Sequence, residues 1–248
     1  MRLSARAQPA WPARGSGAEQ SMRANRNTPV ALCFLLLLRV ASSQTNPPVP
    51  APNPASAKDA ASSNAWSSLF DGKSLAGWRI TDFAGHGEVR IDNGRLILES
   101  GIMTGVTWTN DLPRMHYEIS LEAMRVEGSD FFCGLTFPVD KAPCSLIVGG
   151  WGGGVVGLSN LDGEDAANNE TTQFVRFENN RWYRIRLRVQ PDRIQAWIDD
   201  DQLVDVVITE RRISIRPEVE LSVPLGVASW STTAALRHLR LRRLAEKP

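Results

Sequence analysis

The sequence predicts an all-β fold, a sandwich of two antiparallel sheets, for residues 66–245. Apolar and polar residues alternate at 117–123 and 183–189, which is the period of a strand with one face in a core and one in water. Gly, Asn, Asp and Pro separate such runs, as at 92–94. No segment of this region carries an apolar stripe of helical period and length. Two sheets of this kind bury their apolar faces by packing against each other.

The first 43 residues have the pattern of an export signal. Arg23 and Arg26 precede an apolar run at 30–38, and small residues end the pattern just before Gln44. The apolar run is too short to cross a bilayer as a mature helix. Met22 is the more natural start. We therefore expect an exported protein (periplasmic, cell-surface or extracellular) with no stable membrane span after signal cleavage.

Residues 44–65 are rich in Pro, Ala and Ser, so we expect a disordered, extended linker. The chain has 28 basic and 27 acidic residues, of which seven basic and two acidic residues precede Trp66. The domain that follows therefore has 21 basic and 25 acidic residues. The domain is therefore mildly acidic, at about −4, and has no electrostatic reason to bind nucleic acid. Its length, about 180 residues, suffices for a single core.

The domain opens at 69–78 with Leu-Phe-Asp-Gly-Lys-Ser-Leu-Ala-Gly-Trp. Apolar residues bracket the turn-forming Asp-Gly-Lys-Ser, so this segment reads as an apolar anchor, a tight turn and a second anchor.

A hairpin is expected in the middle of the domain, with strands near 128–137 and 144–148 and its turn at Pro138–Val139. That register places Cys133 opposite Cys144, at a separation that suits a disulfide. An exported protein with an even pair of cysteines favours the bridge, and two buried thiols are the alternative.

The run Gly-Gly-Trp-Gly-Gly-Gly at 149–154 follows. No helix with Lys and Ser or Thr comes after it, so it is not a phosphate-binding loop. Its glycines permit a close approach around Trp151, whose ring could stack on a sugar face. Trp108 has the same potential. For each of them the alternative is a Trp that fills core.

A loop at 159–172 concentrates carboxylates and amides. Its oxygens could hydrogen-bond sugar hydroxyls or hold a divalent cation, although the spacing is not that of an EF-hand. A solvated acidic loop is the plain alternative. We take Asn160, Asp162 and Asn169 as candidate sugar-binding residues and Glu170 as a candidate catalytic residue. The sequence leaves open which cofactor, if any, the protein uses and which residues would bind a divalent cation.

Two further candidates for acid–base chemistry lie outside that loop. Asp130 stands at the start of the central hairpin, in the same region as the Gly-rich run, where strand alternation gives way to polar residues. His86 lies between two glycines in a loop where a substrate could reach it, although a lone loop histidine is more often simply solvated.

Four segments resemble the 3-keto-disaccharide hydrolase family. Residues 69–78 fill every fixed position of its Leu-Phe-(Asp/Asn)-Gly-Lys-x-Leu-x-Gly-Trp opening, and 89–98, 181–187 and 195–200 resemble later strands. The resemblance covers residues 69–244 and implies a jelly-roll sandwich of the concanavalin A-like kind. It also implies cleavage of the glycosidic bond of a 3-keto-sugar, because the ketone acidifies the hydrogen on carbon 2.

The family's central strands carry Asn-Ser-Gly-Ile-x-x-Arg and Tyr-Glu-x-Gln-Ile-x-Asp stretches, and their counterparts here (130–137 and 144–149) lack those polar residues. The resemblance thus carries over the fold but not the site. Two functions remain open. One is an exported hydrolase or lyase acting on 3-keto-disaccharides, with its own site around Asp130, Trp151 and the acidic loop. The other is a non-catalytic carbohydrate-binding or surface scaffold module. In both a carbohydrate is the ligand.

Overall fold

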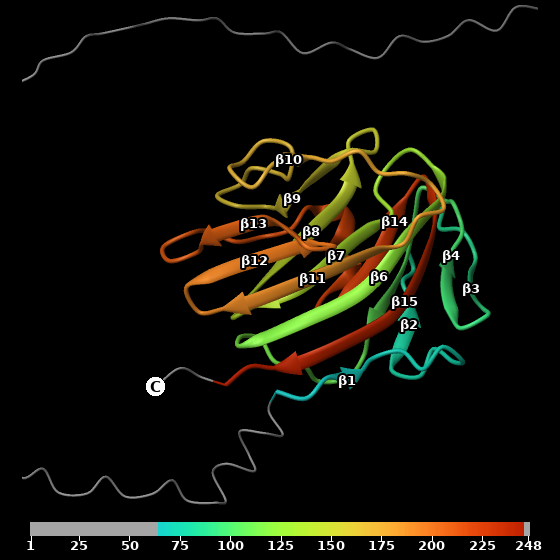
Figure 1. Cartoon of the computed structure of the whole chain (residues 1–248), viewed down its shortest axis with the longest axis horizontal. Helices are drawn as coiled ribbons and strands as arrows, with labels where there is room; N and C mark the ends of the chain where they lie inside the picture. Colours follow the sequence, from blue (N-terminus) through green and yellow to red (C-terminus); the bar gives the residue numbers. More distant parts are fainter. Residues whose placement is uncertain (1–63, 246–248) are drawn as a thin grey trace, which may run out of the picture. The chain divides into compact units, whose positions relative to one another are not determined.

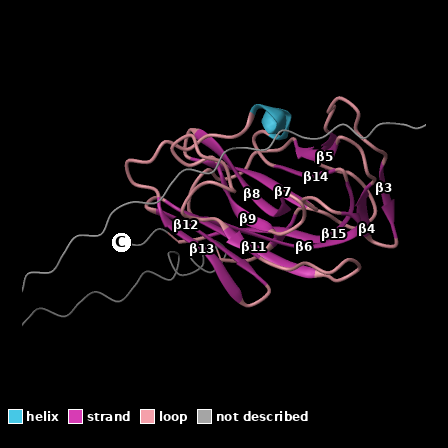
Figure 2. Ribbon diagram, turned by 90° about the horizontal axis from the view of Figure 1, so that it is seen from above, coloured by secondary structure: helices cyan, strands magenta, loops and turns pink. Residues whose placement is uncertain are grey.

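The computed structural model of the protein describes residues 64–245. The predictions for the leader at 1–43 and for nearly all of the linker at 44–65 lie outside the described residues. Within them, the predicted all-β fold is confirmed: two antiparallel sheets pack face to face as a jelly-roll sandwich (Figures 1 and 2).

One sheet has eight strands, with β1 pairing beside β15. Its strands, in spatial order, are β13 (Asp201–Val207), β12 (Arg193–Ile198), β11 (Tyr183–Gln190), β6 (Tyr117–Gly128), β15 (Thr232–Arg243), β4 (Arg95–Leu98) and β3 (Val89–Asp92), with β1 at Ser67–Ser68.

The other sheet has seven strands. In spatial order these are β10 (Gln173–Phe174), β9 (Val155–Ser159), β8 (Ala142–Gly150), β7 (Cys133–Val139), β14 (Gly226–Trp230), β5 (Met103–Trp108) and β2 (Trp78–Ile80). A short 3-10 helix, η1 (Pro217–Ser222), lies over the outer side of this sheet (Figure 2).

The core lies between the sheets and follows the predicted alternation. In β11 the inward Ile185 and Leu187 are fully buried, whereas Arg184 points outward and is exposed. Leu135 and Leu146 close the core from the seven-stranded sheet. Because each strand hides every second side chain, the remaining residues of both sheets form two outer faces.

The opening segment folds as its sequence indicates. The side chain of Asp71 accepts hydrogen bonds from the backbone N–H groups of Lys73 and Ser74, at 2.7 and 2.8 Å, and so forms the turn. Phe70 and Trp78 are buried on either side of it, and Trp78 Nε1 donates to the carbonyl of Leu69 at 2.7 Å.

The predicted disulfide is wrong, because the hairpin has a different register. Cys133 pairs with Val148 and Cys144 with Phe137, since the turn falls at Asp140 and Lys141 instead of two residues earlier. The cysteines are therefore four positions out of register, about 13 Å along the strands, far beyond the reach of a disulfide. Both are free thiols inside the core. Burial raises the pKa of each thiol to about 12.

Candidate functional site

The outer face of the seven-stranded sheet carries small and hydroxylated residues in rows across the strands. One row of five neighbours runs from β5 to β9: Thr107, Gly226, Thr136, Ser145 and Ser159. The next row contains Gly105, Ala228, Gly134, Ile147 and Gly157. Such short side chains leave room above the sheet, and this is where the structure is hollowed.

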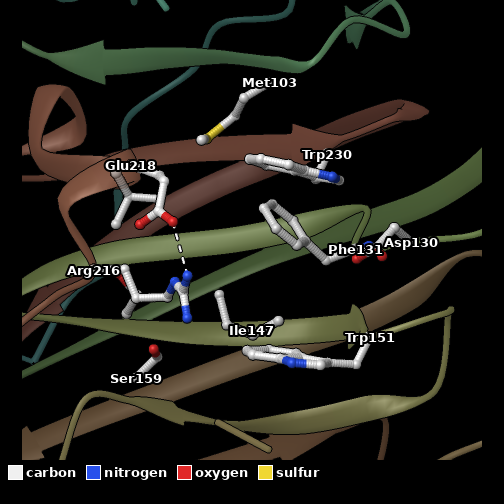
Figure 3. Close-up of a pocket in the computed structure, with 11 residues that line it drawn as sticks. Met103, Asp130, Phe131, Ile147, Trp151, Ser159, Arg216, Glu218 and Trp230 are labelled. Carbon is white, nitrogen blue, oxygen red and sulfur yellow. Dashed lines mark hydrogen bonds and ion pairs between the residues drawn. The ribbon is translucent and has the colours of Figure 1, made fainter. Parts of the chain in front are cut away.

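The hollow has a volume of about 230 Å³ and is bounded by strands, by η1 and by the Gly-rich turn (Figure 3). Its lining comprises Met103, Asp130, Phe131, Ser145, Ile147, Trp151, Ser159, Arg216, Glu218, Val219 and Trp230. Figure 3 shows the aromatic rings gathered on one side and the Arg216–Glu218 pair on the other. An apolar wall facing a charged one is the usual composition of a site for a polar organic ligand.

Three aromatic rings form the apolar side. Phe131 and Trp230 lie with ring centroids 6.4 Å apart and rings tilted by 41°. Trp151 stands at the tip of the Gly-rich turn with 45% of its surface exposed. The backbone there is left-handed, with φ of 49° at Trp151 and 85° at Gly152. Glycines suit this conformation, so they allow the turn to hold Trp151 out over the hollow.

Asp130 secures that turn. Its Oδ1 accepts from the backbone N–H of Phe131 at 2.7 Å, and its Oδ2 accepts from that of Gly152 at 3.3 Å. The backbone N–H of Asp130 itself donates to Thr232 Oγ1 at 3.1 Å. One carboxylate thus fixes both the aromatic wall and the Trp151 turn while remaining part of the lining of the hollow.

Arg216 and Glu218 form the charged side. Arg216 Nη2 donates to Glu218 Oε1 at 2.7 Å, and Arg216 Nη1 to Asp165 Oδ2 at 3.2 Å. The hydrogen bond to Arg216 lowers the pKa of Glu218, and the same bond raises the pKa of Arg216. Both groups are therefore held ionised next to the aromatic side.

The sequence-predicted residues divide into two sets. Asp130 and Trp151 come together in the hollow, as expected. Trp108 does not line it: its ring packs onto the core against Trp78, with centroids 5.1 Å apart at 66°. Trp108, the last residue of β5, therefore packs against the core, which is the alternative that the sequence left open.

The acidic loop is held by ion pairs and does not line the hollow with its predicted residues. Arg211 binds Asp162 and Glu170 together. The Asn169 amide donates to the carbonyls of Leu158 and Asp165, each at 2.8 Å. Asp162, Glu170 and Asn169 therefore stabilise the conformation of the loop.

Asn160 and His86 also lie outside the lining. The backbone N–H of Asn160 donates to the carbonyl of Ser214 at 2.6 Å, and its Oδ1 accepts from Ser159 Oγ at the same distance. His86 is exposed, and its Nδ1 lies 2.8 Å from the carbonyl oxygen of Gly87. Within residues 64–245, no cluster of three or more His, Cys, Asp or Glu side chains could hold a metal ion.

Sequence reasoning missed Arg216, Glu218, Phe131 and Trp230. Arg216 and Glu218 flank Pro217 in a segment without apolar–polar alternation. In the sequence this segment looks like an ordinary solvent-exposed loop, so nothing marks the two residues as part of a site. A usable signal did exist in the strands: Ser145 and Ser159 occupy outward positions between core residues, and their register aligns them in one row.

Comparisons with known proteins agree with this architecture. The sequence pattern of the family described as 3-keto-alpha-glucoside-1,2-lyase-like domain matches residues 65–242. No curated protein sequence matches the chain significantly. In the described part of the chain, no helix is both long and apolar enough to cross a membrane.

Solved structures match at low sequence identity. A Crh5 transglycosylase in complex with NAG has a TM-score of 0.51 at 11% identity, over 74% of this chain and 85% of that one. The apo form scores 0.50 at 10% identity, over 75% and 86%. A carbohydrate-binding module, CBM66 from Bacillus subtilis, scores 0.47 at 14% identity, over 67% and 95%. At these identities the likeness to the transglycosylase supports the fold alone.

Proposed function

Because the chain belongs to the family of 3-keto-alpha-glucoside-1,2-lyase-like domains, we propose that the hollow binds a sugar oxidised at carbon 3 and that the protein cleaves its glycosidic bond. The observation that carries the proposal is the meeting, in one hollow, of a half-exposed Trp151, the carboxylate of Asp130 and the fixed cation of Arg216.

The binding step follows from the two sides of the hollow. The apolar face of a pyranose ring stacks on Trp151, and its hydroxyl groups meet the charged side. Arg216 offers donors and Glu218 offers acceptors, already ordered by their mutual hydrogen bond. Ser145 and Ser159 supply further hydroxyls from the floor.

The chemical step is an elimination. A carboxylate, Asp130, removes the hydrogen from carbon 2 as a proton, and the electron pair of that C–H bond forms the enolate of the 3-ketone. The enolate then expels the oxygen at carbon 1, and a double bond forms between carbons 1 and 2. The departing oxygen takes from Asp130 the proton that this residue has just removed, and leaves as an alcohol. The guanidinium of Arg216 stabilises the enolate charge. Addition of water to the double bond completes a net hydrolysis.

The test is turnover of a 3-keto-disaccharide, such as 3-keto-trehalose, by the wild-type protein and by Asp130→Asn. Loss of a general base lowers kcat/KM by about 10²–10⁴-fold. Asp111→Asn is the matched control, because Asp111 is exposed and outside the hollow. Parallel assays with chelator and with added divalent cation determine whether a metal contributes. Equal turnover by wild type and Asp130→Asn would remove Asp130 as the base.

One observation favours the second candidate, a non-catalytic sugar-binding module. Both carboxylates of the hollow are already engaged, Asp130 by two backbone N–H groups and Glu218 by Arg216. Sugar binding that depends on Trp151, with no product formed from any 3-keto-disaccharide, would favour this candidate over the enzyme.

We also propose that the protein is exported and that its mature chain begins near Gln44. The leader pattern supports this, since small residues end just before that position. N-terminal sequencing of the secreted fraction tests it. A mature chain starting at Met1 or Met22 would contradict processing by this signal.

A further inference from the structure

The outer face of the eight-stranded sheet carries a regular array of arginines. Strand β6 lies between β11 and β15 (Figure 1), and along its first half, the outward residues Glu118, Ser120 and Glu122 each have an arginine beside them on both neighbouring strands. The rows are Arg188–Glu118–Arg242, Arg186–Ser120–Arg240 and Arg184–Glu122–Arg237. The outer rows place a glutamate between their arginines, whereas the middle row places a serine there.

The first outer row shows what the array does with an anion. Glu118 is fully buried by its neighbours: Arg188 Nε donates to one carboxylate oxygen at 2.6 Å and Arg242 Nε to the other at 2.5 Å. In the third row, Arg237 Nε donates to Glu122 at 2.7 Å. The β11 arginine of that row, Arg184, pairs instead with Asp200, so the first row is the one in which an oxyanion bridges a β11 arginine and a β15 arginine.

The middle row lacks that anion. Among the described residues, Arg240 makes no ion pair and no side-chain hydrogen bond. The carboxylate nearest to Arg186 is Glu118, at 3.7 Å, and Glu118 already serves Arg188 and Arg242. Four arginines of these two rows thus share one carboxylate, which leaves a surplus of positive charge over Ser120.

Two indoles hold the array in place. Trp197 lies under the guanidinium carbons of Arg186 and Arg188, at 3.9 and 5.3 Å from its ring centroid. On the β15 side of the array, the ring centroid of Trp66 lies 4.7 Å from the guanidinium carbons of both Arg240 and Arg242. Stacking through the flat faces leaves the N–H edges free to bind and lowers the conformational entropy that binding costs.

We propose that Arg186 and Arg240, together with the hydroxyl of Ser120, bind an external oxyanion with the chemistry of phosphate or sulfate. Two guanidinium forks match the geometry of such a group, and Ser120 supplies the donor that the glutamate rows lack. Burial lowers the pKa of Arg186, Glu118 opposes this, and Arg188, Arg242 and Arg184 add to the lowering. A bound anion would relieve the repulsion among these arginines.

This site is independent of the sugar hollow. It lies on the outer face of the other sheet, and none of its residues lines the hollow. It therefore does not depend on the proposed glycosidic chemistry.

The experiment measures thermal unfolding of the full chain in sodium phosphate and in sodium chloride of equal ionic strength. We expect phosphate to raise the Tm by a few degrees at concentrations about tenfold above its Kd. Arg240→Gln should weaken phosphate binding at least about tenfold, because one charge-assisted pair is lost. Arg193→Gln is the matched control: it removes an arginine of the same sheet that already pairs with Asp205 at 2.9 Å.

A second variant tests the reasoning from the rows. Ser120→Glu places a carboxylate in the middle row, so the Tm in chloride should rise and the response to phosphate should vanish. If this variant fails to fold, Arg240→Gln still decides. An equal response to phosphate in wild type, Arg240→Gln and Arg193→Gln, or no response in any of them, would overturn the proposal.

A third arm distinguishes the source of the anion. A sulfated oligosaccharide that binds at least about tenfold more tightly than inorganic sulfate, with the same dependence on Arg240, identifies the anion as a substituent of a glycan. Equal affinities identify a free anion.

Discussion

In the folded domain, Cys133 and Cys144 should remain unreactive toward a thiol reagent until the domain unfolds. Both side chains are fully buried, and burial raises the pKa of each thiol from 9.0 to about 12. At pH 8, a pKa of 12 leaves about one thiolate in ten thousand molecules, about a thousandfold fewer than a pKa of 9. Burial in the core reduces access further, so labelling will follow the rate of unfolding.

The assay is a colorimetric thiol titration, without reductant, of a chain that begins at Gln44. We expect no reactive thiols under native conditions and two in guanidinium. Cys144→Ala should titrate one in guanidinium, which calibrates the count. Two thiols that appear only after reduction would mean a disulfide, and the hairpin register described above would be incorrect. Rapid labelling of the native protein would instead refute the burial.

The raised pKa values of the two thiols also predict that the folded domain loses stability at alkaline pH. A thiol whose pKa is raised by folding favours the folded state fully below its unfolded pKa, and this contribution is lost as the pH rises through the folded pKa. The window therefore runs from about pH 9 to about pH 12. Cys144→Ala should show a smaller loss of stability across that window than the wild type.

Three further outcomes follow from the site. Trp108→Ala should cost roughly 3–5 kcal/mol of stability, as expected for a ring on the core, whereas Trp151→Ala should mainly weaken sugar affinity; calorimetric melting and titration on the same samples check this. Sugar affinity should survive acidification to the ordinary glutamate pKa of 4.5 and fall only at lower pH, since the hydrogen bond to Arg216 lowers the pKa of Glu218, and Arg216→Gln should move that fall to higher pH. Asn169→Ala should destabilise the loop by about 2 kcal/mol, measured by denaturant unfolding, without a direct loss of sugar contacts.

The fold could be predicted because the longer strands carry their own evidence in the alternation of apolar and polar residues. Alternation in β11 identifies Ile185 and Leu187 as core without knowledge of any partner strand. The candidate site could be predicted only in part: Trp151 lies within a Gly-rich run, a local signal, and Asp130 falls in the same polar region of the sequence. Register is not local. A shift of two residues in the turn between β7 and β8, from Pro138–Val139 to Asp140–Lys141, separated the cysteines.

Register also explains why both candidate sites use residues that look ordinary in the sequence. Ser145 and Ser159 are ordinary strand residues until pairing aligns them on the floor of a hollow. Ser120 is likewise ordinary in its strand, where it sits between two glutamates in an alternating pattern. The pairing of β6 with β11 and β15 places Ser120 between Arg186 and Arg240, in the one of the three rows that has no carboxylate between its arginines. In a two-layer β-sandwich, each outer face is made of side chains from neighbouring strands. A site on such a face therefore depends on which residues pair across strands more than on any one segment of the sequence.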